Sequence, residues 1–331
     1  MVSIITNTAC FNAGTRIATA AGQVAVENLH EGADALLAAG GNARIKWIGH
    51  RVVDCTRHPN PTDVWPIRVC RGAFADNAPV RDLMLSPDHS VFIDGVLIPI
   101  RYLLNGATIR QEARATVTYW HVELDHHGVI LAEGLPCESF LDTGNRGAFT
   151  NGGEAVMLHP DFALQVWERE ACAKLVVAGA ELQAARSFLL DRAAALGHVM
   201  TDNADLHLVV NGEILRPEID GRVYRFALPN NAASVHLISR HGVPAEMFDV
   251  NSDHRRLGVA ISAVHVDDVA QDVADMTGQG WHAAEAGWRW TDGAATIKVA
   301  GARGLKVEVM TAARSWQTVV AETKMQLAES A

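Results

Sequence analysis

The sequence predicts a mainly β protein of two domains with a helical connector between them. Its 331 residues exceed the ~100 to 200 residues of one ordinary domain. Short apolar segments alternate with Gly-centred turns along most of the chain, a pattern typical of antiparallel strands. We therefore expect an all-β first domain over residues 1–150, a helical connector over 151–200 and a β-rich, sandwich-like second domain over 201–331.

The first domain is expected to consist of hairpins. Asp94-Gly95 is the strongest hairpin signal in the chain, because both residue types accept the positive φ of a tight two-residue turn. Apolar β-forming residues flank this turn on both sides, and similar segments flank other turns. The strands that these patterns predict cover residues 15–19, 23–26, 43–49, 90–93, 96–98, 116–124 and 129–132.

The connector and the second domain carry different patterns. Apolar residues recur at steps of three and four from Leu182 to Leu196, and Gly197 stands where a helix C-cap belongs. A short helix is expected over 267–277, because an Asp begins it and Gly278 follows its end. The strands of the second domain are expected at 223–228, 235–239, 257–266, 296–300 and 305–310.

Composition excludes several classes of protein. Apolar residues make up 49% and charged residues 20% of the chain, so a core can form and wholesale disorder is excluded. The net charge is −10, from 28 basic and 38 acidic residues, which argues against nucleic-acid and anionic-membrane partners. No apolar segment reaches the ~18 residues of a membrane span, and no signal peptide is visible. We expect a cytoplasmic location, with secretion by a route without a signal peptide left open.

Cysteine usage and absent motifs exclude further classes of protein. The five cysteines are an odd number without a CxxC pair, which argues against a disulfide framework and a thiolate zinc site. The chain has no P-loop, GxGxxG, HExxH or GxSxG motif. We expect no cofactor and no bound metal. Metal binding by His121, His126 and His127 around one hairpin is an alternative that we do not favour.

Three segments of the first domain carry candidate reactive residues. Cys10-Phe11 precedes a Gly14-Thr15 turn, Ser86 stands three residues before His89, and His121 lies in an aromatic strand that leads into the hairpin ending at Pro136. Together these segments resemble the opening, the Thr-x-x-His motif and the closing hairpin of a Hedgehog/intein (Hint) autoprocessing domain. The subgroup that they resemble is the bacterial Hint-domain proteins, over roughly residues 10–145.

The resemblance implies autocatalytic cleavage at the Ala9–Cys10 bond. Cys10 would attack the Ala9 carbonyl and convert the peptide bond into a thioester, an N-to-S acyl shift. His89 would contact and protonate the Cys10 amide nitrogen. Ser86 would orient His89 or the scissile carbonyl, and His121 would carry the thiol proton. The chain would thus act as a single-turnover cysteine autoprotease on itself.

The sequence departs from the splicing inteins after the closing hairpin. It reads Cys137-Glu138-Ser139 there, without the Asn that cyclises in splicing. We therefore expect cleavage without protein splicing, with the thioester resolved by water or an external small nucleophile. The product would be the chain's own N-terminal peptide, Met1–Ala9.

A different interpretation treats the first domain as a catalytically silent scaffold. A single Cys is more often a buried core residue than a nucleophile. In the second domain, Trp281, Trp288 and Trp290 lie near Glu285 and Asp292, and aromatic rings flanked by such groups bind sugars by stacking and hydrogen bonds. The alternative function is therefore glycan or protein binding by the second domain. A Trp-rich core hairpin is the structural explanation of the same residues.

Overall fold

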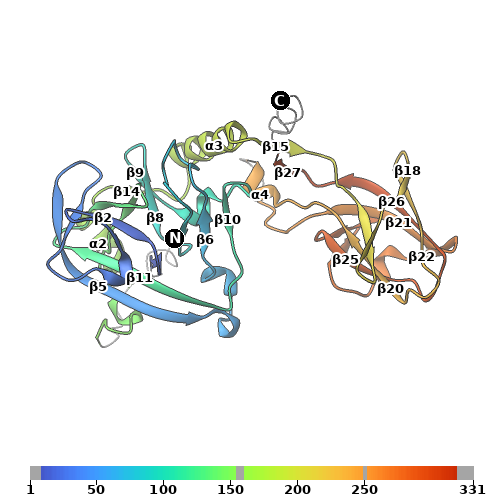
Figure 1. The fold of residues 1–331 in the computed structure, drawn as a ribbon, viewed down its shortest axis with the longest axis horizontal. Helices are drawn as coiled ribbons and strands as arrows, with labels where there is room; N and C mark the ends of the chain where they lie inside the picture. The colour runs from blue at the N-terminus through green and yellow to red at the C-terminus, as the bar shows by residue number, and fades with distance from the viewer. Residues whose placement is uncertain (1–8, 154–159, 249–251, 319–331) are drawn as a thin grey trace, which may run out of the picture. The chain divides into compact units, whose positions relative to one another are not determined.

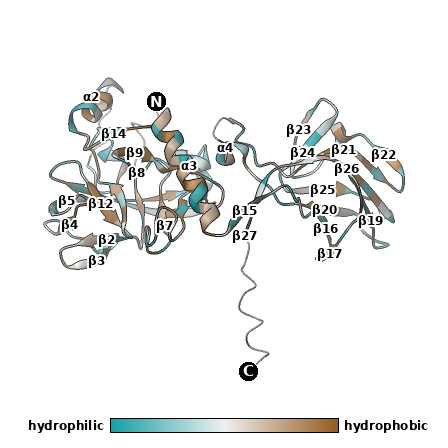
Figure 2. Cartoon of the chain, turned by 90° about the horizontal axis from the view of Figure 1, so that it is seen from above, coloured by the Kyte–Doolittle hydropathy of each residue, from teal (hydrophilic) through white to brown (hydrophobic). Residues whose placement is uncertain are grey.

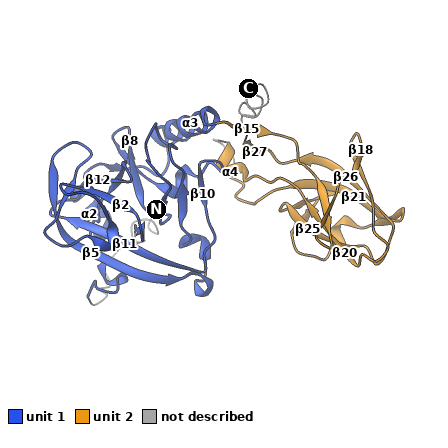
Figure 3. Ribbon diagram, in the orientation of Figure 1, with its two compact units in different colours: residues 1–196 blue, residues 197–331 orange. Residues whose placement is uncertain are grey.

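The chain folds into two units, residues 1–196 and 197–331, which Figures 1 and 3 show. The structure is a computed structural model that describes residues 9–153, 160–248 and 252–318. Both units consist mostly of β-strands, as the sequence predicts. None of the helices in these ranges is long and apolar enough to cross a lipid bilayer.

Unit 1 is built from short strands, two α-helices and several single turns of 3₁₀-helix. The strands are β1 (Phe11–Asn12), β2 (Arg16–Thr19), β3 (Gly22–Ala25), β4 (Asp34–Leu36), β5 (Asn42–Asp54), β6 (Ile67–Val69), β7 (Leu83–Leu85), β8 (Ser90–Ile93), β9 (Val96–Pro99), β10 (Ile109–Gln111), β11 (Thr116–Leu124), β12 (Val129–Ala132), β13 (Leu135–Glu138) and β14 (Lys174–Leu175). The helices are η1 (Val26–Asn28), η2 (Cys55–Arg57), η3 (Pro61–Asp63), η4 (Ile100–Leu103), η5 (Arg146–Ala148), α2 (Pro160–Glu170) and α3 (Ala180–Ala195).

One extended sheet connects all the strands of unit 1. Its order is β10-β6-β7-β1-β11-β5-β4-β2-β12-β13-β8-β9-β14, with β3 paired to β2. The predicted Asp94-Gly95 turn is confirmed, since both residues have positive φ (48° and 83°) and join β8 to β9. The sheet places β1 between β7 and β11, so residues near positions 10, 85 and 120 become neighbours.

The predicted helix over 182–196 is confirmed as α3. Ala185 and Leu189 are buried in the core of unit 1, and Gly197 has a φ of 89° directly after the C-cap residue Leu196. Figure 2 colours α3 in both hydrophobic and hydrophilic tones, as expected for a helix with one buried face. The described helical residues of the 151–200 segment therefore belong to unit 1.

Unit 2 contains two main sheets. Its strands are β15 (His198–Thr201), β16 (His207–Val210), β17 (Glu213–Leu215), β18 (Glu218–Asp220), β19 (Val223–Ala227), β20 (Ser234–Ile238), β21 (Val259–Val266), β22 (Val269–Gln271), β23 (Trp281–Glu285), β24 (Trp288–Thr291), β25 (Ala294–Lys298), β26 (Gly304–Ala312) and β27 (Ser315–Thr318); its helices are α4 (Pro244–Met247) and η6 (Val273–Asp275). The sheets run β17-β16-β20-β25 and β18-β19-β26-β21-β24-β23, with β22 beside β21 and a separate β15–β27 pair. Both sheets contribute to one apolar core, which includes Leu237 and Val307. The unit is therefore sandwich-like.

The predicted helix over 267–277 is wrong. Asp267 and Asp268 have positive φ (46° and 63°) and form the turn of a hairpin between β21 and β22. Only the short η6 turn follows. Asp tolerates this left-handed conformation better than most residues, so an Asp-Asp pair suits a two-residue hairpin turn as well as a helix start.

Candidate functional site

Cys10 immediately precedes β1, in the interior of the unit 1 sheet. The next residue, Phe11, pairs with Leu85 of β7 on one side and with Trp120 of β11 on the other. Ser86 directly follows Leu85. Strand pairing therefore brings the Ala9–Cys10 bond beside the Ser86–His89 segment, which is 76 residues away in the sequence.

Two hydrogen bonds join Cys10 to Ser86. The Cys10 N–H donates to Ser86 Oγ at 2.8 Å, and the Ser86 N–H donates to the Cys10 carbonyl oxygen at 2.9 Å. Both residues are buried. The nitrogen of the candidate scissile bond thus contacts the Ser86 hydroxyl, where the resemblance implied a contact with His89.

His89 and His121 are buried next to Phe11. Their ring centroids lie 5.0 Å apart, and the Phe11 ring centroid lies 4.2 Å from His89 and 5.7 Å from His121. The His89 ring interacts with the backbone of Cys10 and Glu138. Neither of its nitrogens has a hydrogen-bond partner of normal geometry among the described residues. The structure therefore brings all four predicted residues of the first domain together.

Both imidazoles are neutral at pH 7. Burial lowers the pKa of His89 to about 4, against the opposing effect of the Glu138 carboxylate. Burial, and to a smaller extent the neighbouring His89 ring, holds the pKa of His121 well below its usual range. The Val122 N–H donates to His121 Nδ1 at 3.1 Å, so this nitrogen carries a lone pair and Nε2 carries the proton. Neutral imidazoles can accept a proton from one group and return it to another.

The Cys10 thiol lies in apolar surroundings. It belongs to a cluster of buried side chains that also contains Trp47, Tyr119 and Phe140. Burial raises the pKa of the thiol to about 12, although the charge and hydrogen bonding of Arg51 act in the opposite direction. The resting Cys10 is therefore a thiol at neutral pH, and its reaction requires a base to remove the proton.

Sequence reasoning missed Arg51. This residue lies on β5 opposite Tyr119 of β11, and its guanidinium carbon is 5.9 Å from the centre of the Tyr119 ring. Its Nε is buried without a hydrogen-bond partner in the described part of the chain. A cation beside a cysteine favours the thiolate. No local motif marks Arg51, because only strand pairing brings it to Cys10.

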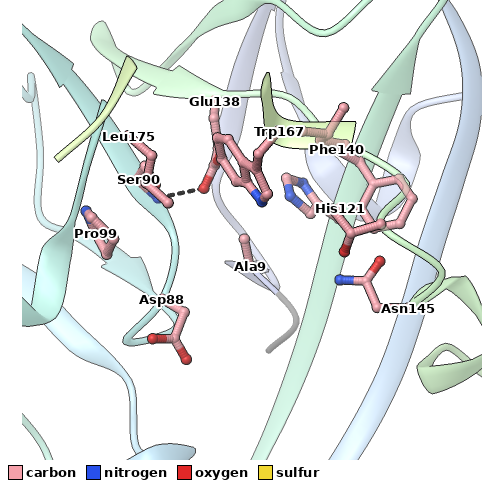
Figure 4. A pocket seen from close by; sticks show the side chains of 12 residues that line it. Ala9, Asp88, Ser90, Pro99, His121, Glu138, Phe140, Asn145, Trp167 and Leu175 are labelled. Carbon is pink, nitrogen blue, oxygen red and sulfur yellow. Dashed lines mark hydrogen bonds between the residues drawn. The ribbon is translucent and has the colours of Figure 1, made fainter. Parts of the chain in front are cut away.

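A small cavity of about 20 Å³ lies beside Ala9. Asp88, His121, Glu138 and Asn145 line it together with Ala9. Figure 4 shows Ala9 in the middle of this group, with His121 and Asn145 on one side in this view and Asp88 on the other. A cavity of this size and polarity holds about one water molecule. The acyl side of the candidate scissile bond therefore borders a space of the size of one water.

The histidines of the closing hairpin have different surroundings. His121 belongs to the Cys10 site, His126 is exposed, and the side chain of His127 is buried with Nε2 3.7 Å from the carboxylate of Glu138. Among residues 9–153, 160–248 and 252–318, no group of three or more His, Cys, Asp or Glu side chains is arranged to hold a metal ion. In the sequence, Glu138 stands out only because it follows the closing hairpin. No motif predicts its pairing with His127.

Trp281, Trp288 and Trp290 of unit 2 do not share one platform. Trp288 lines a cavity of about 290 Å³ together with Asp272 and Glu285. The Trp281 indole N–H donates to the Thr296 carbonyl oxygen at 2.9 Å, and its ring packs against the core of the unit. Trp290 is half-buried on β24. The surroundings of Trp288 are therefore open to a ligand, whereas Trp281 has a structural role.

Comparison with known proteins is informative for unit 1. The family model described as Hint domain matches residues 9–144. No curated protein matches the sequence. Solved structures similar to part of the chain include the gp41-1 intein (11% identity, 40% of this chain and 98% of that chain, TM-score 0.30), the MchDnaB-1 intein (16%, 38% and 98%, 0.28) and a bacterial intein-like domain from Clostridium thermocellum (16%, 40% and 100%, 0.31).

Proposed function

We propose that the segment of residues 9–144, which matches the Hint-domain family model, cleaves its own chain at the Ala9–Cys10 bond. The reaction is an N-to-S acyl shift without protein splicing. The observation that carries the proposal is the 2.8 Å hydrogen bond from the Cys10 N–H to Ser86 Oγ. It holds the nitrogen that must leave against a hydroxyl that can supply its proton.

The surrounding side chains transfer the protons and stabilise the charge in the remaining steps of the reaction. The Cys10 sulfur attacks the Ala9 carbonyl carbon, the carbon–nitrogen bond breaks, and Ala9 becomes the acyl group of a thioester. The thiol proton passes to a neutral imidazole, His121 or His89, and a proton reaches the leaving amine through Ser86. Arg51 stabilises the sulfur anion that forms during the attack.

Water is the nucleophile that the site favours for the second step. The cavity beside Ala9 has the volume of about one water molecule, and the polar groups of His121 and Asn145 border it. Attack of water on the thioester carbonyl releases the N-terminal peptide and returns the Cys10 thiol. Residues 1–8 of this peptide lie outside the described residues. An external small nucleophile such as a thiol can replace water at this step.

Intact mass spectrometry of the purified full-length chain tests the proposal. We expect loss of the Met1–Ala9 mass, accelerated by dithiothreitol or hydroxylamine, because both attack thioesters. Ser86→Ala should slow the loss about tenfold, since one buried hydrogen bond contributes about 1 to 1.5 kcal/mol. Ser86→Thr, which keeps the hydroxyl, should retain most of the rate.

Cys10→Ala is the control that removes the nucleophile. Loss of the same peptide from this variant would assign the cleavage to a contaminating protease or to hydrolysis without a thioester. An unchanged mass in the wild-type chain under every condition would contradict self-cleavage.

The dry surroundings of the Cys10 thiol favour a second candidate function. A thiol with a pKa of about 12 in an apolar cluster is also what an inactive scaffold would contain. Unit 2 would then bind a glycan or protein, with Trp288 in its cavity of about 290 Å³. A glycan panel monitored by Trp fluorescence tests this function. A response lost in Trp288→Ala but kept in Trp290→Ala would support it, and silence across the panel would oppose it.

A further inference from the structure

A buried carboxylate borders the small cavity beside Ala9. Glu138 is the last residue of β13, and its side chain is 3% exposed. Cys137 of β13 pairs with Val91 of β8. The residues next to this pair, Glu138 and Ser90, therefore lie beside each other on the two strands. Both line the cavity of about 20 Å³ together with Ala9, so an acidic side chain lies on the acyl side of the candidate scissile bond.

The Glu138 side chain is held in place by one of its two oxygens. The Ser90 N–H donates to Glu138 Oε1 at 2.6 Å, the bond drawn as a dashed line in Figure 4. Glu138 Oε2 is 3.7 Å from His127 Nε2, which is longer than a hydrogen bond. The backbone of β8 thus orients the carboxylate, and Oε2 keeps lone pairs for a further donor.

A second polar atom indicates a water position in this cavity. Ser90 is 1% exposed, and its Oγ has no hydrogen-bond partner among residues 9–153, 160–248 and 252–318. A buried hydroxyl without a partner is costly, and an ordered water commonly satisfies such a group. The cavity has the volume of about one water molecule. A water bonded to Ser90 Oγ would share this cavity with Glu138 and Ala9.

Asp88 also lines the cavity, but its carboxylate is already engaged. Its Oδ1 forms an ion pair of 2.8 Å with Arg101 Nε, and its Oδ2 accepts a hydrogen bond of 2.9 Å from the same guanidinium. A cation bound to both oxygens makes a carboxylate a weaker base. Glu138 is therefore the better candidate to take a proton from a water in the cavity.

We propose that Glu138 is the general base for hydrolysis of the Ala9 thioester and that Ser90 Oγ holds the attacking water. This inference rests on the proposed acyl shift at Cys10, because it concerns the step that follows that shift. It adds two residues to the proposed reaction, and neither belongs to the nucleophile or to the groups that protonate the leaving amine.

The proposed step uses water as its only co-reactant. One water proton moves to the Glu138 carboxylate while the water oxygen forms a bond to the Ala9 carbonyl carbon. The bond between this carbon and the Cys10 sulfur breaks, and the proton on Glu138 is passed to the departing sulfur. The products are a peptide that ends in the Ala9 carboxyl group and the free Cys10 thiol.

Two cleavage rates of the full-length chain separate this step from the acyl shift. Intact mass gives the rate in buffer alone, where water resolves the thioester, and the rate in hydroxylamine, a nucleophile that needs no base from the protein. Glu138→Gln should slow cleavage in buffer about 30-fold or more, since a general base contributes roughly 10² to 10⁴. Ser90→Ala should slow it about fivefold. In both variants the hydroxylamine rate should stay within about twofold of wild type.

Glu133→Gln is the matched control. Glu133 is also buried and accepts a backbone hydrogen bond, at 2.7 Å from the Arg16 N–H, but it does not line the cavity. We expect both of its rates to equal those of wild type. Glu138→Asp, which keeps a carboxylate, should restore part of the buffer rate. If Glu138→Gln lowers the melting temperature, the Ser90→Ala rates decide.

The two rates also distinguish failure of this inference from failure of the acyl shift. An unchanged buffer rate in Glu138→Gln, or equal slowing of both rates, would overturn the role of Glu138 as the base. A wild-type chain that hydroxylamine does not cleave would contradict the acyl shift itself and this step with it.

Discussion

The reactive residues of unit 1 owe their properties to burial more than to their chemical type. An isolated Cys ionises near pH ~8.5 and an isolated His near ~6.5. In this chain, burial raises the pKa of Cys10 to about 12 and lowers that of His89 to about 4. The nucleophile and its neighbouring base are therefore both uncharged at pH 7, and the acyl shift depends on proton transfer inside a dry site.

Stability should fall as the pH decreases from about 6.5 to about 4, and His89→Gln should reduce this fall. The unfolded His89 titrates near pH ~6.5, whereas the folded one titrates near 4. Between these values the unfolded chain binds a proton that the folded chain does not, so stability rises with pH there. The contribution of His89 between pH 4.5 and 6.5 is about 2 kcal/mol.

Urea unfolding of unit 1 at pH 4.5 and 6.5 measures this difference. His127 adds little within the window, because its folded pKa is about 9 and only the upper end of the window reaches its unfolded pKa of about 6.5. The carboxylates and His121 contribute alike to the pH dependence of wild type and of His89→Gln. The same pH dependence in wild type and His89→Gln would contradict a neutral, buried His89.

The stability of a single helix in this fold depends on the one face that it buries. In α3 the steps of three and four predict a helix with a buried side, and Leu189 lies fully buried on that side. The neighbouring Phe188 is 47% exposed. At the other extreme, the Asp267-Asp268 segment has no such face, and the sequence signal for a helix there was wrong.

Leu189→Ala should destabilise unit 1 by about 2 to 5 kcal/mol, because it removes a buried side chain and leaves a cavity. Phe188→Ala is the matched control in the same helix, and we expect a change within about 0.5 kcal/mol for it. Chemical denaturation followed by circular dichroism gives both values. Equal losses in the two variants would show that α3 does not pack on the core through Leu189.

Each unit has a main apolar core of its own within the described residues, and unit 1 also has the smaller cluster around Cys10. Unit 1 contains the segment that matches the Hint-domain family model, together with α2 and α3, and unit 2 has a sandwich-like core. The first domain was expected to end near residue 150; the family match ends at residue 144, and unit 1 extends to residue 196. The helices that follow were expected to form a connector, and α3 packs on the core of unit 1.

Two separate cores predict two thermal transitions in differential scanning calorimetry. Val307→Ala, in the core of unit 2, should lower only one of them, by several degrees for a loss of about 2 kcal/mol. Leu189→Ala should lower only the other. A single transition that both substitutions shift equally would mean that the units unfold as one.

Local sequence patterns were enough to predict the features that depend on neighbouring residues. Alternation and Gly-centred turns predicted the strands of both units, the 94–95 turn and the helix that became α3. The Cys10-Phe11 pair and the spacing of Ser86 and His89 resemble Hint-domain motifs, and that resemblance implied which residues would gather near the Ala9–Cys10 bond. These signals are local, because turn geometry and helical periodicity act over a few residues.

The environment of these residues depends on the folded structure. Strand pairing put Ser86 Oγ, and not His89, against the Cys10 nitrogen, and brought Arg51 to the Cys10 thiol. It also placed Glu138 beside His127 and Cys172, three residues that no motif connects. Burial, hydrogen bonding and charge depend on groups far apart in the sequence, so the pKa of a side chain and the partner of a base appear only when the sheet is assembled.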